Sequence, residues 1–119
     1  MKILVCEDDP LVRTVVSMIL ASVGHQVETS NDGQEGLEKI RNHPGAFEVL
    51  ITDNRMPRLT GIELVESLRE MNIPVKVIMA STFAAPLDEE LQHRLRLDGL
   101  LKKPFKMTDL LKSVEALGH

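Results

Sequence analysis

The chain has 119 residues, of which 43% are hydrophobic and 27% charged, and it carries a net charge of −4. These values are typical of a soluble globular protein, and the length suits one domain, residues 1–119, around one hydrophobic core. The negative charge argues against direct nucleic-acid binding by this domain, because such a surface requires a clustered basic face.

Cysteine content and hydropathy exclude further classes. The single cysteine, Cys6, rules out an intrachain disulfide and a cysteine-based metal cluster. No apolar run approaches the length of about 18 residues that a membrane span requires, so we expect no membrane contact. The short apolar start is followed at once by acidic residues, unlike a secretion signal, and we therefore expect a cytoplasmic protein.

Strand-like apolar runs alternate with helical patterns along the chain. The first run, Ile3 to Cys6, leads into a helix that begins at Pro10 after an N-cap at Asp9 and ends at Gly24. Residues 26–30 alternate apolar and polar side chains, which predicts a strand with one less buried side.

The rest of the chain continues the pattern of strand followed by helix. A helix anchored by Leu37 and Ile40 follows the second strand. Beyond it we expect strands at 49–52, 75–80 and 100–102, a helix from Gly61, a helix from Pro86 to about Leu97, and a last helix capped by Thr108.

This alternation predicts an α/β fold, a doubly wound five-stranded parallel sheet with helices on both faces. Right-handed crossovers leave few topologies, and the flavodoxin-like (βα)5 fold with strand order 2-1-3-4-5 is the strongest candidate. In that order the crevice for ligands opens between strands one and three, at their carboxyl ends. We therefore expect a pocket between Asp8 and Asp53.

Polar residues follow the predicted strands and should meet at this edge of the sheet. Glu7 and Asp8 follow the first strand, Asp53 the third, Ser81 the fourth and Lys103 the fifth. Carboxylates placed so close together repel one another unless a cation neutralises them. Mg²⁺ suits the site, because it prefers oxygen ligands and retains several waters.

Asp53 is the candidate for covalent chemistry. A carboxylate beside a metal can attack phosphorus and form an acyl phosphate. Phosphoryl transfer depends mainly on positioning and charge neutralisation, which Mg²⁺, Lys103 and the Ser81 hydroxyl could supply at different oxygens. Taken alone, Lys103 is more often a solvated lysine and Ser81 an ordinary turn residue, so their assignment rests on their occurrence together at the strand ends. A cis peptide bond before Pro104 would hold Lys103 pointing inward.

Over essentially its full length the chain resembles the receiver domain of bacterial two-component response regulators, and the chemotaxis-type receiver in particular. The motifs that carry the resemblance are Ile3 to Pro10, Asp53 with Met56-Pro57 and Gly61, Ser81, and Lys103-Pro104-Phe105. The resemblance implies these roles: phosphoacceptor Asp53, direct metal ligand Asp8, water-mediated ligand Glu7, backbone carbonyl ligand Arg55, switch hydroxyl Ser81 and phosphate-pairing Lys103.

The resemblance also implies a signalling role rather than an enzyme in the usual sense. A sensor histidine kinase or a phosphotransfer protein would donate the phosphoryl group, and the domain would assist its own phosphorylation and dephosphorylation. The surface around strands four and five would then change to control an output domain or partner protein, and homodimer formation on phosphorylation is left open. Three positions depart from the family pattern, namely Leu100 for an aromatic residue, Thr82 for alanine and Thr60 for an acid.

Two other classes of protein compete with this interpretation. A pseudo-receiver would be a pure interaction module with a vestigial pocket, but the complete set of polar residues argues against it. A metal-dependent phosphohydrolase with an aspartyl nucleophile typically carries a second aspartate two residues later, where this chain has Arg55.

Overall fold

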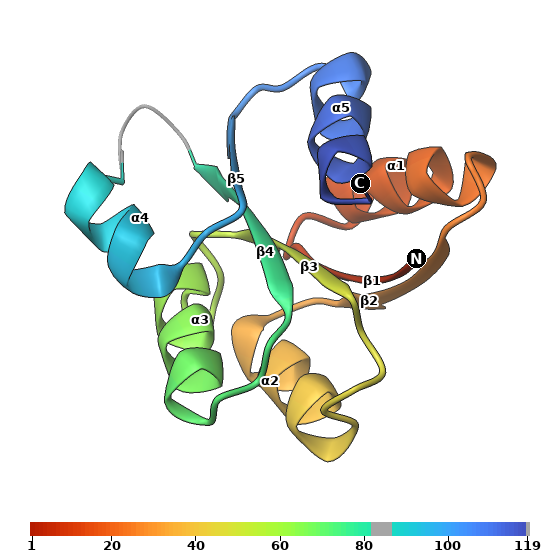
Figure 1. Cartoon of the computed structure of the whole chain (residues 1–119). Helices are drawn as coiled ribbons and strands as arrows, with labels where there is room; N and C mark the ends of the chain where they lie inside the picture. The colour runs from red at the N-terminus through yellow and green to blue at the C-terminus, as the bar shows by residue number, and fades with distance from the viewer. Residues whose placement is uncertain (82–86, 119) are drawn as a thin grey trace.

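A computed structural model of the chain describes residues 1–81 and 87–118 (Figure 1). These residues form a parallel five-stranded sheet in the order β2-β1-β3-β4-β5, which confirms the predicted flavodoxin-like fold. In chain order the elements are β1 (Lys2–Cys6), α1 (Pro10–Ser22), β2 (Gln26–Ser30), α2 (Gly33–Asn42), β3 (Val49–Asp53), α3 (Gly61–Glu70), β4 (Lys76–Ser81), α4 (Glu89–Leu95), β5 (Gly99–Lys102) and α5 (Met107–Leu117).

The sheet is buried by helices on both faces. Figure 1 shows α1 and α5 on one face, and α2, α3 and α4 on the other. Side chains alternate across each strand, so in β1 Ile3 and Val5 pack toward α1 and α5, whereas Leu4 and Cys6 pack toward α2 and α3. β3 is buried at every residue, which is expected for the central strand of a doubly wound sheet.

The start of α1 agrees with the prediction. The Asp9 carboxylate accepts hydrogen bonds from the backbone N–H groups of Leu11 and Val12, and Pro10 occupies the first helical position. The helix ends at Ser22, and Gly24 follows with a positive φ of 97°. The acidic turn after β1 is therefore held in place by the helix cap.

The last two helices both begin beside a carboxylate, and the predicted start of the second of them was wrong. α4 begins at Glu89, where the Asp88 carboxylate accepts the N–H of Leu91 at 2.8 Å, and the predicted start at Pro86 lies outside the described residues. α5 begins at Met107, so Thr108 lies inside the helix instead of capping it. In both cases a carboxylate sets the boundary, because at α5 the Asp109 side chain accepts the N–H of Lys106 at 3.1 Å.

Two strands, β3 and β4, end one residue later than predicted, and the last residue of each is a candidate site residue. Asp53 is the last residue of β3 and pairs with Ala80, while Ser81 is the last residue of β4 and pairs with Lys102. The backbones of Asp53 and Ser81 are consequently held by the sheet itself.

Candidate functional site

An acidic cluster lies at the carboxyl ends of β1 and β3, where the strand order reverses. Glu7, Asp8 and Asp53 each offer a carboxylate oxygen, and these atoms lie within 4.8 Å of one another. Glu7 and Asp53 are only 5% and 8% exposed, whereas Asp8 is open to solvent. The structure thus brings together the three acids that the sequence predicted, at the predicted switch point.

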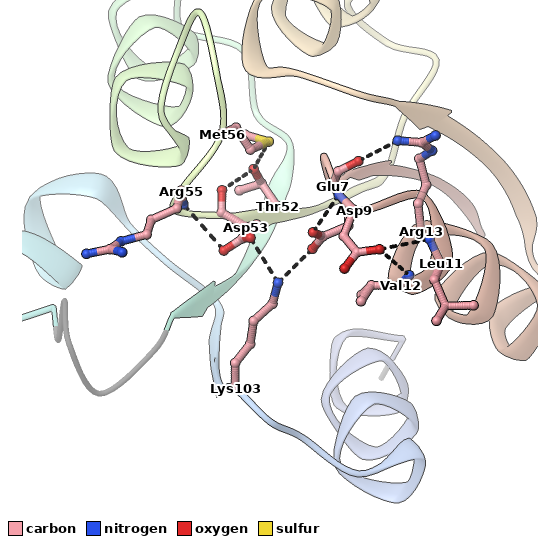
Figure 2. Close-up of polar contacts among 10 residues, drawn as sticks. All are labelled: Glu7, Asp9, Leu11, Val12, Arg13, Thr52, Asp53, Arg55, Met56 and Lys103. Atoms are coloured by element: carbon pink, nitrogen blue, oxygen red, sulfur yellow. Dashed lines mark hydrogen bonds and ion pairs between the residues drawn. The ribbon is translucent and has the colours of Figure 1, made fainter.

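Lys103 bridges two of these acids. Its Nζ lies 2.9 Å from Glu7 Oε2 and 2.9 Å from Asp53 Oδ2, as Figure 2 shows. The residue follows β5, and its own N–H donates to the carbonyl of Ser81 at 2.7 Å. The peptide bond between Lys103 and Pro104 is cis. A lysine from the far end of the chain therefore reaches the carboxylates of β1 and β3.

Burial and charge perturb both partners of this contact. Burial raises the pKa of Glu7, and the negative charge of Asp53 adds to the effect, outweighing the hydrogen bond from Lys103. Burial lowers the pKa of Lys103, but its hydrogen bonds to Glu7 and Asp53, together with the negative charges of these two residues, raise the pKa overall. Lys103 therefore stays cationic. Its single positive charge does not balance the three carboxylates of the acidic cluster.

The loop after β3 lies against the acidic cluster. Asn54 anchors its start, because its N–H donates to Ala80, its carbonyl accepts from Gly61, and its side-chain oxygen accepts from Ile62. Together with Asp8, residues 54–56, Thr60 and Ile62 line an open cavity of about 470 Å³. The backbone N–H of Arg55 donates to Asp53 Oδ1 at 3.4 Å, while its exposed guanidinium points away from Asp53 (Figure 2).

Ser81 lies at the same edge, between the strand that carries Asp53 and the segment that carries Lys103. It is 4% exposed and ends β4. Leu100, the predicted switch residue, lies in β5 and is half-buried against the core side that contains α3 and α4. Thr82 lies outside the described residues. Thr60, which replaces the acid usual before Gly61, caps α3 in a full capping box with Glu63.

Two supports of the site escaped the sequence analysis. The backbone N–H of Asp9 donates to Glu7 Oε1 at 3.2 Å, and Arg13 Nη1 donates to the carbonyl of Glu7 at 2.9 Å (Figure 2). The position of Arg13 in the first turn of α1 is the only signal that could have indicated this contact, since the capped helix begins directly beside Glu7. Together these bonds fix Glu7 from both its side chain and its backbone.

Comparisons with known proteins agree with this geometry. The sequence profile of the response regulator receiver domain matches residues 3–115. A transcriptional regulatory protein, the CpxR homolog of Haemophilus influenzae, is 32% identical over 98% of this chain and 49% of its own length. The sensor histidine kinase RcsC of Salmonella typhimurium is 32% identical over 98% of this chain and 12% of its own length.

Solved structures show the same fold. The chemotaxis response regulator CheY4 of Vibrio cholerae superposes with a TM-score of 0.86 at 32% identity, covering 98% of this chain and 97% of the other. The chain belongs to the response regulator receiver domain family. Receiver domains are the phosphoacceptor modules of two-component signalling systems, and this chain carries an acidic cluster of Glu7, Asp8 and Asp53.

The chain spans about half the length of the Haemophilus relative and a smaller share of the Salmonella kinase. Within the described residues, no helix is both long enough and apolar enough to cross a membrane.

Proposed function

We propose that Asp53 accepts a phosphoryl group in a Mg²⁺-dependent reaction, and that this modification controls a partner through the surface of α4, β5 and α5. One observation carries the proposal most directly. The ammonium group of Lys103 lies 2.9 Å from Asp53 within a cluster of carboxylates that it cannot balance alone. Such a site is built to receive a cation and an anionic group together.

The donor set fits Mg²⁺. Carboxylate oxygens within 4.8 Å of one another are hard ligands, and the open cavity beside them leaves room for the waters that Mg²⁺ retains. Asp8, Asp53 and the carbonyl of Arg55 would hold the ion. Glu7, whose two oxygens accept hydrogen bonds from Asp9 and Lys103, would act through a water, which is the role that the resemblance to receiver domains implies. When bound, Mg²⁺ supplies positive charge to the phosphoryl oxygens.

The chemical step requires one bond to form and one to break. A carboxylate oxygen of Asp53 attacks the phosphorus of a phosphohistidine, so that an O–P bond forms while the P–N bond breaks. The leaving imidazole keeps the electron pair and takes up a proton. Lys103 would pair with one phosphoryl oxygen, and the Ser81 hydroxyl would donate to another.

The partners follow from the family. A sensor histidine kinase or phosphotransfer protein would supply the phosphohistidine, and an output domain or separate protein would respond. The Haemophilus and Salmonella relatives show that a matching segment occurs both in a transcriptional regulatory protein and in a sensor kinase. We therefore propose that residues 1–119 form one cytoplasmic receiver domain, whose homodimerisation after phosphorylation is a separate question.

The test is phosphate uptake from a small donor. Wild-type protein incubated with acetyl phosphate and Mg²⁺ should gain the mass of one phosphoryl group, and Asp53→Asn should gain none. Asp109→Asn, an aspartate on α5, is the matched control and should be modified like wild type. Uptake by Asp53→Asn would refute the assignment, and no uptake by wild type would favour the pseudo-receiver alternative.

A further inference from the structure

The loop that carries Arg55 is tied to a neighbouring helix by an ion pair outside the acidic cluster. Arg58 Nη1 lies 3.2 Å from Asp32 Oδ2. The Asp32 side chain is 12% exposed and the Arg58 side chain 59%. The other oxygen of Asp32 accepts the N–H of Glu35 at 2.8 Å and so caps α2. Asp32 thus links the start of α2 to the loop of residues 54–60, the β3–α3 loop.

A backbone contact reinforces this link. A β-carbon added at Gly33 would overlap the carbonyl group of Leu59, so the loop packs directly on the first turn of α2. The contact requires glycine at this position, because any larger residue would push the loop away. Ion pair and backbone contact lie side by side, since Asp32 precedes Gly33 and Arg58 precedes Leu59.

The loop conformation itself needs such support. Arg58 has a φ of 68°, in the left-handed region that residues other than glycine rarely adopt. On the other side of the loop, Met56 is buried in the core and its Sδ lies 3.9 Å from Thr52 Oγ1. Arg55 therefore sits between Asp53, held by the sheet, and a loop whose far half is held by α2. An unfavourable backbone angle persists where surrounding contacts determine it.

We propose that Asp32 and Arg58 are positioning residues for the cation site. Their ion pair holds the β3–α3 loop, and thereby the carbonyl of Arg55, in place relative to Asp8 and Asp53. The inference rests on the proposed Mg²⁺ site and adds a role for two residues that do not touch the ion. Because Arg58 is largely exposed, its loss should weaken Mg²⁺ binding only about three- to fivefold.

The experiment is a double-mutant cycle on Mg²⁺ affinity. Arg58→Ala removes the cation, and Asp32→Asn removes the charge while keeping an oxygen for the α2 cap. Isothermal titration of Mg²⁺ suits a chain with no tryptophan or tyrosine. Each variant should bind about three- to fivefold more weakly, and the double variant no more weakly than either alone. Arg58→Lys should retain part of the affinity.

A second ion pair provides the matched control. Arg94 Nη2 lies 3.1 Å from Glu66 Oε2, with side chains 63% and 40% exposed, and it links α3 to α4 away from the loop. Arg94→Ala and Glu66→Gln should leave Mg²⁺ affinity unchanged. An equal loss in these controls would overturn the inference.

The melting temperatures of the metal-free variants distinguish a role in positioning the cation site from a role in stabilising the fold. If Arg58→Ala and Asp32→Asn lower the melting temperature without changing Mg²⁺ affinity, the ion pair is merely structural and the inference is wrong. If the wild type binds no Mg²⁺, the proposed cation site fails and this inference fails with it. Normal Mg²⁺ binding by the wild type and by both variants would overturn this inference alone.

Discussion

At the residue scale, Lys103 and Glu7 define the resting state of the site. Lys103 contacts Glu7 and Asp53 equally closely, so it compensates part of their charge before any phosphoryl group is present. Glu7 is held by Lys103, by the N–H of Asp9 and, through its backbone, by Arg13. Asp8 is exposed and is therefore the acid of the cluster most accessible to a cation, whereas Glu7 is buried and already hydrogen-bonded.

The first prediction concerns this order. Asp8→Ala should weaken Mg²⁺ binding more than Glu7→Ala, because a direct ligand is lost in the first case and a water-mediated one in the second. Loss of a residue that acts indirectly typically costs about tenfold or more in metal affinity. Mg²⁺ titration of both variants measures the ranking. Wild-type affinity in Asp8→Ala would contradict it.

The second prediction is a pH dependence in the metal-free protein. Burial, the largest effect, raises the pKa of Glu7 above its ordinary value of 4.5. Just above pH 4.5 the folded protein therefore holds a proton that the unfolded chain has released. Binding of this proton stabilises the folded state. Its contribution to the free energy of unfolding is complete below pH 4.5 and is lost as the pH rises through the raised pKa of Glu7. Because glutamine does not titrate, the free energy of unfolding of Glu7→Gln should fall less than that of wild type as the pH rises over this range.

Urea unfolding in EDTA from about pH 4 to about pH 7 measures the effect. The free energy of unfolding of Glu7→Gln minus that of wild type should increase with pH. Glu70→Gln, an exposed glutamate on α3, serves as the control and should show no such trend. A difference that stays constant across the range would argue against the assigned direction of the Glu7 shift.

At the element scale, the strand ends position the candidate site residues, and hydrogen bonds from α3 anchor the carboxyl end of α4. Arg69 on α3 donates to the carbonyls of Leu95 and Arg96, at 2.8 and 3.1 Å, at the end of α4. It also donates to the carbonyl of Val75 at 2.9 Å, just before β4. α4 has only seven residues, too few to be stable without tertiary contacts, so this arginine holds its carboxyl end against α3.

The third prediction follows from that contact. Arg69→Met should destabilise the protein by about 1–3 kcal/mol, because hydrogen bonds from a charged donor to partly buried carbonyls are lost. Amide exchange of residues 89–97 should become faster. Arg94→Met, whose partner is a side chain on α3, is the matched control and should change exchange little. Unchanged exchange over α4 in Arg69→Met would refute the role of Arg69.

At the scale of the whole molecule, the sheet connects the proposed phosphorylation site at Asp53 to the region of α4 and β5. Ser81 ends β4, and Leu100 lies in β5 next to Met79 in the strand register. Leu100 is half-buried on the same side of the sheet as α4. A hydrogen bond from Ser81 to the phosphoryl group would therefore bias the packing of this region between two states.

The fourth prediction tests this coupling. Phosphorylation should change amide exchange across residues 87–101, including α4 and β5, and not only beside Asp53. Ser81→Ala should still become phosphorylated, yet show a smaller change over α4 and β5. Exchange that slows only near Asp53 would contradict the coupling. Leu100→Ala tests the contribution of side-chain packing, and it too should reduce the response.

Sequence patterns predicted most of the fold, because the signals are local. Apolar runs of four to six residues followed by turn residues indicate buried strands, and the parallel order then places their carboxyl ends at one edge. Glu7, Asp8 and Asp53 are accordingly found together. Helix starts were less predictable, since α5 begins at Met107, where Asp109 accepts the N–H of Lys106, and not at the cap expected at Thr108.

The sequence by itself determined the strand order, the acidic cluster and the approach of Lys103, because period and strand ends suffice to place them. Only the tertiary structure decided which long side chains support these elements. Arg13 at Glu7, Arg58 at Asp32 and Arg69 at the end of α4 all bridge segments with long, flexible side chains. Such contacts produce no periodic pattern in the sequence. They depend on how far apart the packed elements lie and on how they are oriented.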